Sequence, residues 1–308
     1  MDPHHSGSTL RSGVKVAAPQ TIATNLSHLS MLFQLNGRAS AYHAKDNPLG
    51  NPREGFLASH WMTGKRKQLF RAWYEEGSAV PLTLDKVTQV LRRLDSLAAS
   101  EGIRPLDWLC HLRDGLCFNF CWVTGQRGDD AGKLTLDDLW CNDQGLRLMQ
   151  LMPIPAAGQV LFVSCRGSKT HQDSRLKPFD LEAGGDPLLD YPTRLAHFLS
   201  ESVRLGHPVT QYISHPLNRR KNGFKEAPYS EDNQTSRLEG HLNALGLNGG
   251  ESGHSFPCGT LQAAHADGAS EAQLREGVQM QSLAVMRRYL NPTRHHPRQA
   301  KHVRAEAS

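Results

Sequence analysis

Apolar residues recur at helical spacing along most of the chain. Separations of three and four residues predict amphipathic helices. Thr83 suits the N-cap of the second such segment, and Gly102 suits its end. Two stripes of this kind lie in the first third of the chain, formed by Ile22, Leu26, Leu29, Leu32 and Phe33 and by Val87, Val90, Leu91, Leu94 and Leu97.

The periodicity changes beyond residue 104. A third helical stripe consists of Leu109, Leu112, Leu116, Phe120 and Val123. Residues 159–164 and 175–181 instead favour two strands, and the segment between them is typical of a hairpin turn. Helical patterns then return at about 188–205 and 235–246, followed by two short helices between 270 and 290.

These patterns predict a mainly α fold of the α+β class with several parts. Residues 1–20 are polar and are expected to be a disordered tail. Residues 21–103 are expected to form a small helical bundle, and residues 104–291 a mostly helical domain with a small antiparallel sheet. Residues 292–308 form a basic tail.

Composition is that of a globular protein. The 308 residues are 38% hydrophobic and 21% charged. No run of about 18 apolar residues occurs, so we expect no membrane span. The first residues lack an apolar signal core, which favours an intracellular protein.

The six cysteines are spread along the chain without paired spacing, which favours free thiols. Cys117 and Cys121 are four residues apart, as two metal ligands on one helix can be, but no second pair accompanies them. Cysteine is also a common small core residue. We therefore expect no metal and no cofactor.

Basic residues gather in three places. The formal net charge is only +5, which is compatible with nucleic-acid binding and equally with an ordinary solvated surface. A basic tail covers residues 294–304. The two internal clusters consist of Lys65, Arg66, Lys67 and Arg71, and of Arg219, Arg220, Lys221 and Lys225.

Four positions along the chain carry candidate chemistry. Arg127 directly follows a helix that ends at Gly125, so its planar guanidinium can face a phosphate, with Asp130 within reach to orient it. Lys169 lies at the predicted hairpin tip, and His254 precedes a helical pattern. Tyr289 is flanked by two arginines. Each taken alone has an ordinary structural alternative: a surface salt bridge, an exposed turn lysine, a turn histidine or a core tyrosine.

Taken together, the order Arg, Lys, His and Tyr resembles the tyrosine recombinase (phage integrase) family. "TGQRGDD" is similar to that family's first arginine motif, His254 opens its His-x-x-Arg box, and Tyr289 follows Met280 by nine residues. "GESGHSF", "GTLQ" and "RRYL" also resemble the integrase-like proteins of eukaryotic mobile elements, including the Crypton type. The resemblance covers about residues 20–291.

The resemblance implies both a reaction and a partner. Tyr289 is the implied nucleophile, which attacks a phosphodiester of double-stranded DNA and forms a 3′-phosphotyrosyl link. The two arginine positions, of which Arg127 is the first, and the position of Met280 are implied to stabilise the phosphate. Lys169 is implied to protonate the leaving oxygen, and His254 to belong to the same catalytic set. Residues 21–103 become a core-binding DNA-binding domain. An active enzyme is implied to assemble as a tetramer on synapsed DNA, and to be nuclear in a eukaryotic host.

Two positions depart from the family pattern. Pro257 stands where the His-x-x-Arg box has its second arginine, and Met280 stands where the family has histidine or tryptophan. Loss of one preorganised donor costs about 3–4 kcal/mol in the transition state, so we expect impaired cleavage. Two alternatives stay open. Another arginine (Arg219, Arg237 or Arg275) replaces the missing one in an active recombinase, or the protein is an interaction protein without a DNA role.

Overall fold

The computed structural model describes the chain in segments. These are residues 8–9, 15–16, 19–38, 49–54, 58, 60–64, 79–141, 146–147, 155–165, 177–280 and 283–290. The chain divides into two compact units, Met1–Gly77 and Ser78–Ser308. No helix in these segments is long and apolar enough to cross a membrane.

The first unit contains helix α1 (Pro19–Leu35), which confirms the first helical stripe, and a short 3-10 turn, η1 (Pro52–Glu54). Asn51 is fully buried and donates from Nδ2 to the Ser30 hydroxyl at 2.8 Å. The same hydroxyl donates to Glu54 at 2.9 Å, so this polar chain joins α1 to η1. Strands β1 (Ser8–Thr9) and β2 (Lys15–Val16) pair antiparallel within the segment expected to be disordered.

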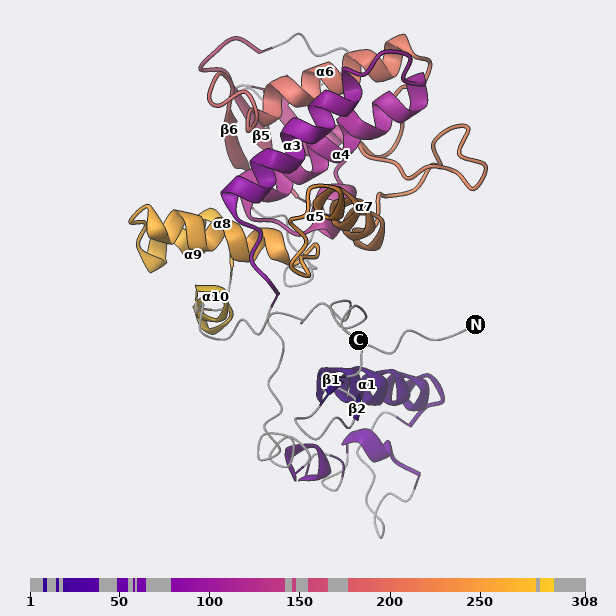
Figure 1. Cartoon of the computed structure of the whole chain (residues 1–308). Coiled ribbons are helices and arrows are strands. Elements are labelled where there is room, and N and C mark those ends of the chain that lie inside the picture. Colours follow the sequence, from indigo (N-terminus) through magenta and orange to yellow (C-terminus); the bar gives the residue numbers. More distant parts are fainter. Residues whose placement is uncertain are drawn as a thin grey trace, which may run out of the picture. The chain divides into compact units, whose positions relative to one another are not determined.

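Three helices form the centre of the second unit. Helix α4 (Pro105–Thr124) is buried on most of its surface, and α3 (Leu84–Ala98) and α6 (Tyr191–Arg204) lie along it (Figure 1). The hydroxyl of Thr83 caps α3 by accepting from the amide of Lys86 at 3.4 Å, as the sequence predicts. The predicted stripe of α3 is buried against α4, except that Leu97 is half-buried.

Because α3 packs into the same hydrophobic core as α4, it belongs to the second unit. The expected boundary after residue 103 separates two helices that share one core. The compact units divide between Gly77 and Ser78 instead. Sequence pattern shows that α3 is a helix with an apolar face, but it does not show which partner covers that face.

A small antiparallel sheet packs against this helical core. Its strands are β3 (Leu139–Cys141), β4 (Leu146–Arg147), β5 (Val160–Val163) and β6 (Phe179–Glu182), in the order β4-β3-β5-β6. The two predicted strands are confirmed as β5 and β6, with Val163 opposite Phe179. Strands β3 and β4 are too short for their alternation to be recognised in the sequence.

The remaining helices pack against α4 or against one another (Figure 1). They are α5 (Gly128–Gly132), α7 (Glu231–Ala244), α8 (Ser255–Ala266), α9 (Glu271–Gly277) and α10 (Leu283–Leu290), together with the 3-10 turn η2 (Leu136–Asp138). The predictions for α6, α7, α9 and α10 are confirmed with shifts of a few residues at their ends. The fold is therefore mainly helical with a small antiparallel sheet, as the sequence predicts.

Gly259 on α8 sets how closely that helix approaches the segment before α3. A Cβ atom at this position would lie 1.7 Å from the carbonyl oxygen of Leu82 and 2.9 Å from the Trp122 ring. Beside it, the Leu82 amide donates to the carbonyl of Ser255 at 3.1 Å. The absent side chain therefore allows backbone to meet backbone at the start of α8.

We expect Gly259→Ala to lower the free energy of unfolding by about 1–3 kcal/mol or more, because the new methyl group overlaps backbone that cannot yield. Gly240→Ala is the matched control, since Gly240 lies within α7 with no atom within 4 Å of an added Cβ. Alanine there is expected to be neutral or to stabilise by up to about 1 kcal/mol. Urea unfolding measures both, and equal effects of the two substitutions would contradict the packing argument.

Candidate functional site

Arg127 lies in a sharp turn between two helices. Helix α4 ends at Thr124, and Gly125 adopts the left-handed conformation with φ 63°. Gln126 then anchors the turn by donating from Nε2 to the carbonyl of Val278 at 3.1 Å. Arg127 is the N-cap of α5 and is half-buried, and its guanidinium makes no hydrogen bond or ion pair with any described residue. This guanidinium is available to an anion.

Asp130 supports the same turn through the backbone. Its carboxylate is buried, which raises its pKa above the ordinary value, and its amide donates to the carbonyl of Arg127 at 3.1 Å. We expected Asp130 to orient the guanidinium of Arg127. The hydrogen bond that the structure shows is instead made with the main chain of Arg127.

His254 occupies the N-cap of α8 without making a side-chain cap hydrogen bond. Its imidazole is half exposed, and Nε2 lies 3.7 Å from Oε1 of Glu231, the first residue of α7. The backbone before it is fixed, because the amide of Gly253 donates to the Thr235 hydroxyl at 3.0 Å. His254 is therefore held against the N-terminal turn of α7.

Pro257 is the third residue of α8 and is buried. Amide groups in the first turn of a helix have no partner within that helix, so a proline there removes no helical hydrogen bond. The next residue, Cys258, is completely buried. The helix thus accommodates proline where the family pattern has arginine, at no cost to its own hydrogen bonding.

Met280 and Tyr289 both pack against a small apolar cluster. The cluster is formed by Leu261, Leu274, Val278 and Met286. Tyr289 is half-buried, and its carbonyl accepts from Nε2 of Gln262 at 2.8 Å. The thioether of Met280 contributes packing and has no proton to donate to a phosphate.

The segments that carry these residues adjoin one another. A Cβ atom on Gly125 would lie 2.5 Å from Val278 and 3.6 Å from Thr260 of α8, and one on Gly128 would lie 3.5 Å from Glu231. The turn of Arg127 therefore contacts both the start of α7 and the body of α8. Lys169 lies outside the described residues, as do Lys65, Arg66, Lys67 and Arg71.

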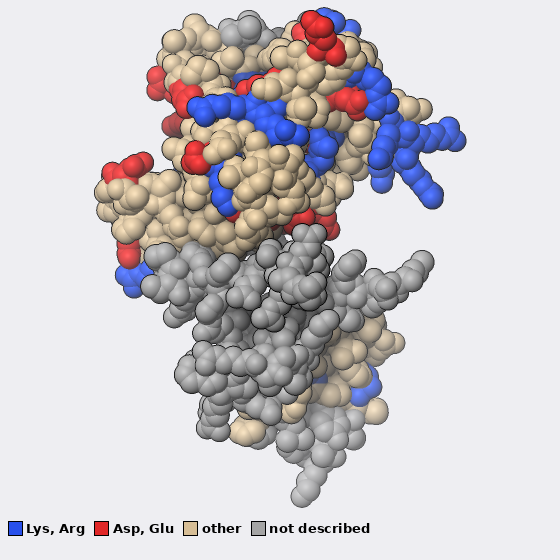
Figure 2. Space-filling model, viewed as in Figure 1, with Lys and Arg blue, Asp and Glu red and all other residues tan. Residues whose placement is uncertain are grey.

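The loop 216–225 between α6 and α7 projects from the second unit (Figure 1). Leu217 and Phe224 form an isolated bridge, the amide of Asn218 donates to the carbonyl of Gly223 at 2.9 Å, and Lys221 takes the left-handed conformation with φ 54°. Arg219, Arg220, Lys221 and Lys225 are exposed, and none of them pairs with an acidic residue within the described segments. Figure 2 shows basic side chains gathered at the end of this loop.

A buried charge cluster holds the base of that loop. The Asp114 carboxylate accepts from the Nη2 of Arg113 at 2.6 Å, the Tyr229 hydroxyl at 2.9 Å and the Nε of Arg237 at 2.6 Å. Arg113 also donates to the carbonyl of His215 at 2.7 Å and lies 3.9 Å from the centre of the Tyr229 ring. The two neighbouring guanidinium groups hold the pKa of Asp114 below its ordinary value, against the effect of burial.

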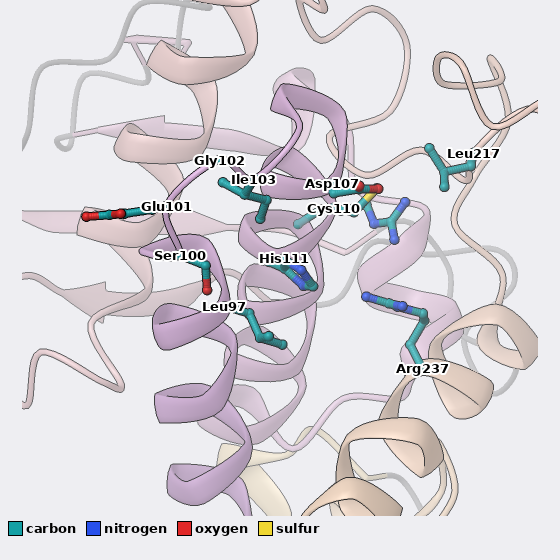
Figure 3. A pocket seen from close by; sticks show the side chains of 11 residues that line it. Leu97, Ser100, Glu101, Gly102, Ile103, Asp107, Cys110, His111, Leu217 and Arg237 are labelled. Carbon is teal, nitrogen blue, oxygen red and sulfur yellow. The ribbon is translucent and has the colours of Figure 1, made fainter.

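A pocket of about 450 Å³ lies beside this cluster, between the α3–α4 turn, α4 and α7 (Figure 3). The side chains that face it include Leu97, His111 and Arg237. Its lining residues do not include Arg127, His254 or Tyr289. Since Arg237 is bound to Asp114 and lines this separate pocket, it does not stand in for the missing arginine beside His254. Within the described segments, no group of three His, Cys, Asp or Glu residues is arranged to hold a metal ion.

Comparisons with known proteins identify the fold. No model of a known protein family matches the sequence, and no curated protein matches it. A solved structure of the XerH site-specific recombinase bound to difH substrate, in a pre-cleavage complex, matches 89% of this chain and 63% of its own at a TM-score of 0.52 and 13% identity. The chain therefore has a fold similar to that of this recombinase structure.

Two further solved structures are similar at lower scores. A post-cleavage complex of XerH with a palindromic difH substrate matches 70% of this chain and 51% of its own, at a TM-score of 0.47 and 16% identity. The XerA recombinase matches 90% of this chain and 80% of its own, at a TM-score of 0.45 and 11% identity. This chain therefore spans between half and two thirds of the length of the XerH chains that it matches.

Asp114→Asn is expected to lower the free energy of unfolding by about 3–5 kcal/mol, because it removes the charge that balances the buried guanidinium of Arg113 and the partly exposed one of Arg237. Asp107→Asn is the control, since Asp107 forms an exposed pair with Arg104 and its loss should cost less than about 1 kcal/mol. Denaturant unfolding at neutral pH compares them, and similar costs would contradict a central role for Asp114.

The contribution of Asp114 to the free energy of unfolding depends on pH in a predictable direction. The pKa of Asp114 is lower in the folded than in the unfolded chain. Its contribution is therefore complete above the ordinary aspartate pKa of about 3.9 and is lost as the pH falls through the folded value. The difference in stability between the natural protein and Asp114→Asn should shrink on acidification below that pH.

Proposed function

We propose that this protein binds double-stranded DNA through a recombinase-type fold and cleaves it poorly or not at all. The observation that carries the binding is the loop 216–225, a structured projection with four exposed basic side chains and no acidic partner among the described residues. Phosphate contacts by lysine and arginine dominate DNA affinity. The fold supports the proposal, since the similar XerH structure is a recombinase bound to its substrate.

Impaired cleavage follows from the chemistry of the candidate site. Among the described residues the Arg127 guanidinium has no ion-pair partner, and Tyr289 is the proposed nucleophile. Pro257 is buried and Met280 packs against the apolar cluster, and neither side chain can donate a hydrogen bond to a phosphate. A transition state that lacks two of its donors is expected to be slowed about 10⁴-fold or more.

Further parts of the proposal rest on the family resemblance. We propose that the first unit is a core-binding domain whose residues 65–71 contact phosphates. We also propose that Lys169 and His254 occupy the family's catalytic lysine and histidine positions, and that an active form would be a tetramer on synapsed DNA. The narrower likeness to the Crypton type rests on the motifs alone, and the solved structures give it no support.

Replacement of Arg219, Arg220 and Lys221 together by alanine is expected to weaken binding to a DNA duplex. It should also reduce the slope of log Kd against log salt by about 2–3, because each phosphate contact contributes about one. Fluorescence anisotropy over a range of salt concentrations measures the slope. Arg92→Ala, an exposed arginine on α3, is the control for a single lost surface charge. An unchanged slope in the triple variant would remove the loop from the DNA interface.

Strand cleavage can be tested with nicked suicide duplexes, which trap a phosphotyrosyl intermediate. We expect no more covalent protein–DNA adduct from the natural chain than from Tyr289→Phe, as judged by denaturing electrophoresis. The sequence of the target site is unknown, so a pool of random duplexes, enriched by binding, supplies the substrate. An adduct that forms efficiently and disappears in Tyr289→Phe would show that the enzyme is active.

A further inference from the structure

The N-terminal turn of α7 contacts the segments that carry two residues of the predicted catalytic set, Arg127 and His254. Glu231 is the first residue of α7, and its Oε1 lies 3.7 Å from Nε2 of His254. A Cβ atom on Gly253 would lie 2.6 Å from the same Oε1, and one on Gly128 would lie 3.5 Å from Cγ of Glu231. Glu231 thus contacts the residue before His254 and the residue after Arg127.

The position of this carboxylate is set by neighbouring contacts. Ser230 caps α7 by accepting from the Asn233 amide at 3.4 Å. Gln234 donates from Nε2 to the carbonyl of Gly128 at 2.6 Å, and Thr235 accepts from the amide of Gly253 at 3.0 Å. The first turn of α7 is therefore bound to both glycine-containing segments, and Glu231 is held between them with its side chain 27% exposed.

The charges around this point do not favour an anion. The family pattern has two arginines. This chain has the first of them, Arg127, and has Pro257 in place of the second. Within the described segments the guanidinium of Arg127 makes no ion pair, while Glu231 faces His254, the second cationic member of the predicted set that the structure describes. Lys133 nearby is already paired with Asp129. Like charges repel, so a phosphodiester between Arg127 and His254 must either displace Glu231 or lie beside its carboxylate.

We propose that Glu231 is a specificity-determining residue that keeps phosphate out of the space between Arg127 and His254. DNA is then held by the loop 216–225 without its backbone entering the catalytic position. This inference rests on the proposed function for the location of the site. It adds a second, independent obstacle to cleavage, because restoring the arginine at Pro257 would leave the carboxylate in place.

Glu231→Gln tests the inference directly. The substitution keeps the size of the side chain and removes its charge. We expect the variant to bind inorganic phosphate about tenfold more tightly than the natural protein does. The NMR shift of the His254 ring proton during a phosphate titration measures this affinity. DNA affinity should rise in the same direction, with a steeper salt dependence. Glu239→Gln, an exposed residue of the same helix, should change neither.

Glu231→Asp keeps the charge and is expected to exclude phosphate as the natural residue does. Circular dichroism and thermal unfolding verify that each variant is folded. Unchanged or weaker phosphate binding in Glu231→Gln would overturn the inference and make Glu231 an orienting partner of His254. Absence of salt-dependent DNA binding by the natural protein would instead contradict the proposed function, while the phosphate titration still decides the role of Glu231.

Discussion

One buried carboxylate determines how the functional half of this molecule is arranged. Asp114 sits on the central helix α4 and accepts hydrogen bonds from Arg113, Tyr229 and Arg237. Through them it fixes the long segment between α6 and α7 and the helix α7 itself. Removing one member of such a cluster leaves an unbalanced buried charge, which makes the arrangement cooperative. The basic loop and Glu231 both depend on this anchor, since the loop lies before Tyr229 and Glu231 lies two residues after it.

Close backbone packing then brings the candidate site together. Gly259 lets α8 approach the segment before α3, and Gly125 and Gly128 let the turn of Arg127 contact α8 and α7. The site that results retains the geometry of an anion site only in part. Arg127 has no ion-pair partner in the part of the chain that the structure describes, whereas Pro257 and Met280 contribute packing and Glu231 contributes negative charge. These features support the proposal that the protein holds DNA more readily than it cuts it.

Sequence periodicity was sufficient to predict the principal helices and the β5–β6 pair, because their apolar faces repeat over several turns or alternate over several residues. It placed α3 in the wrong unit, since a stripe does not specify its partner. Arg127, His254 and Tyr289 were identified through motif order. Glu231 was missed because its significance comes from spatial contacts with Gly128 and Gly253, which lie far from it in sequence. Asp114 was missed because a charged residue within an apolar helix gives no indication of its partners.

Hydrogen–deuterium exchange with and without a DNA duplex tests the central claim most directly, because it reports separately on the loop and on the candidate site. The account predicts that amides of residues 216–225 become protected on DNA binding while those of residues 127–130 and 254–258 exchange at unchanged rates. Protection of the Arg127 and His254 segments to the same extent as the loop would show that the phosphate backbone enters the site, and would contradict the account.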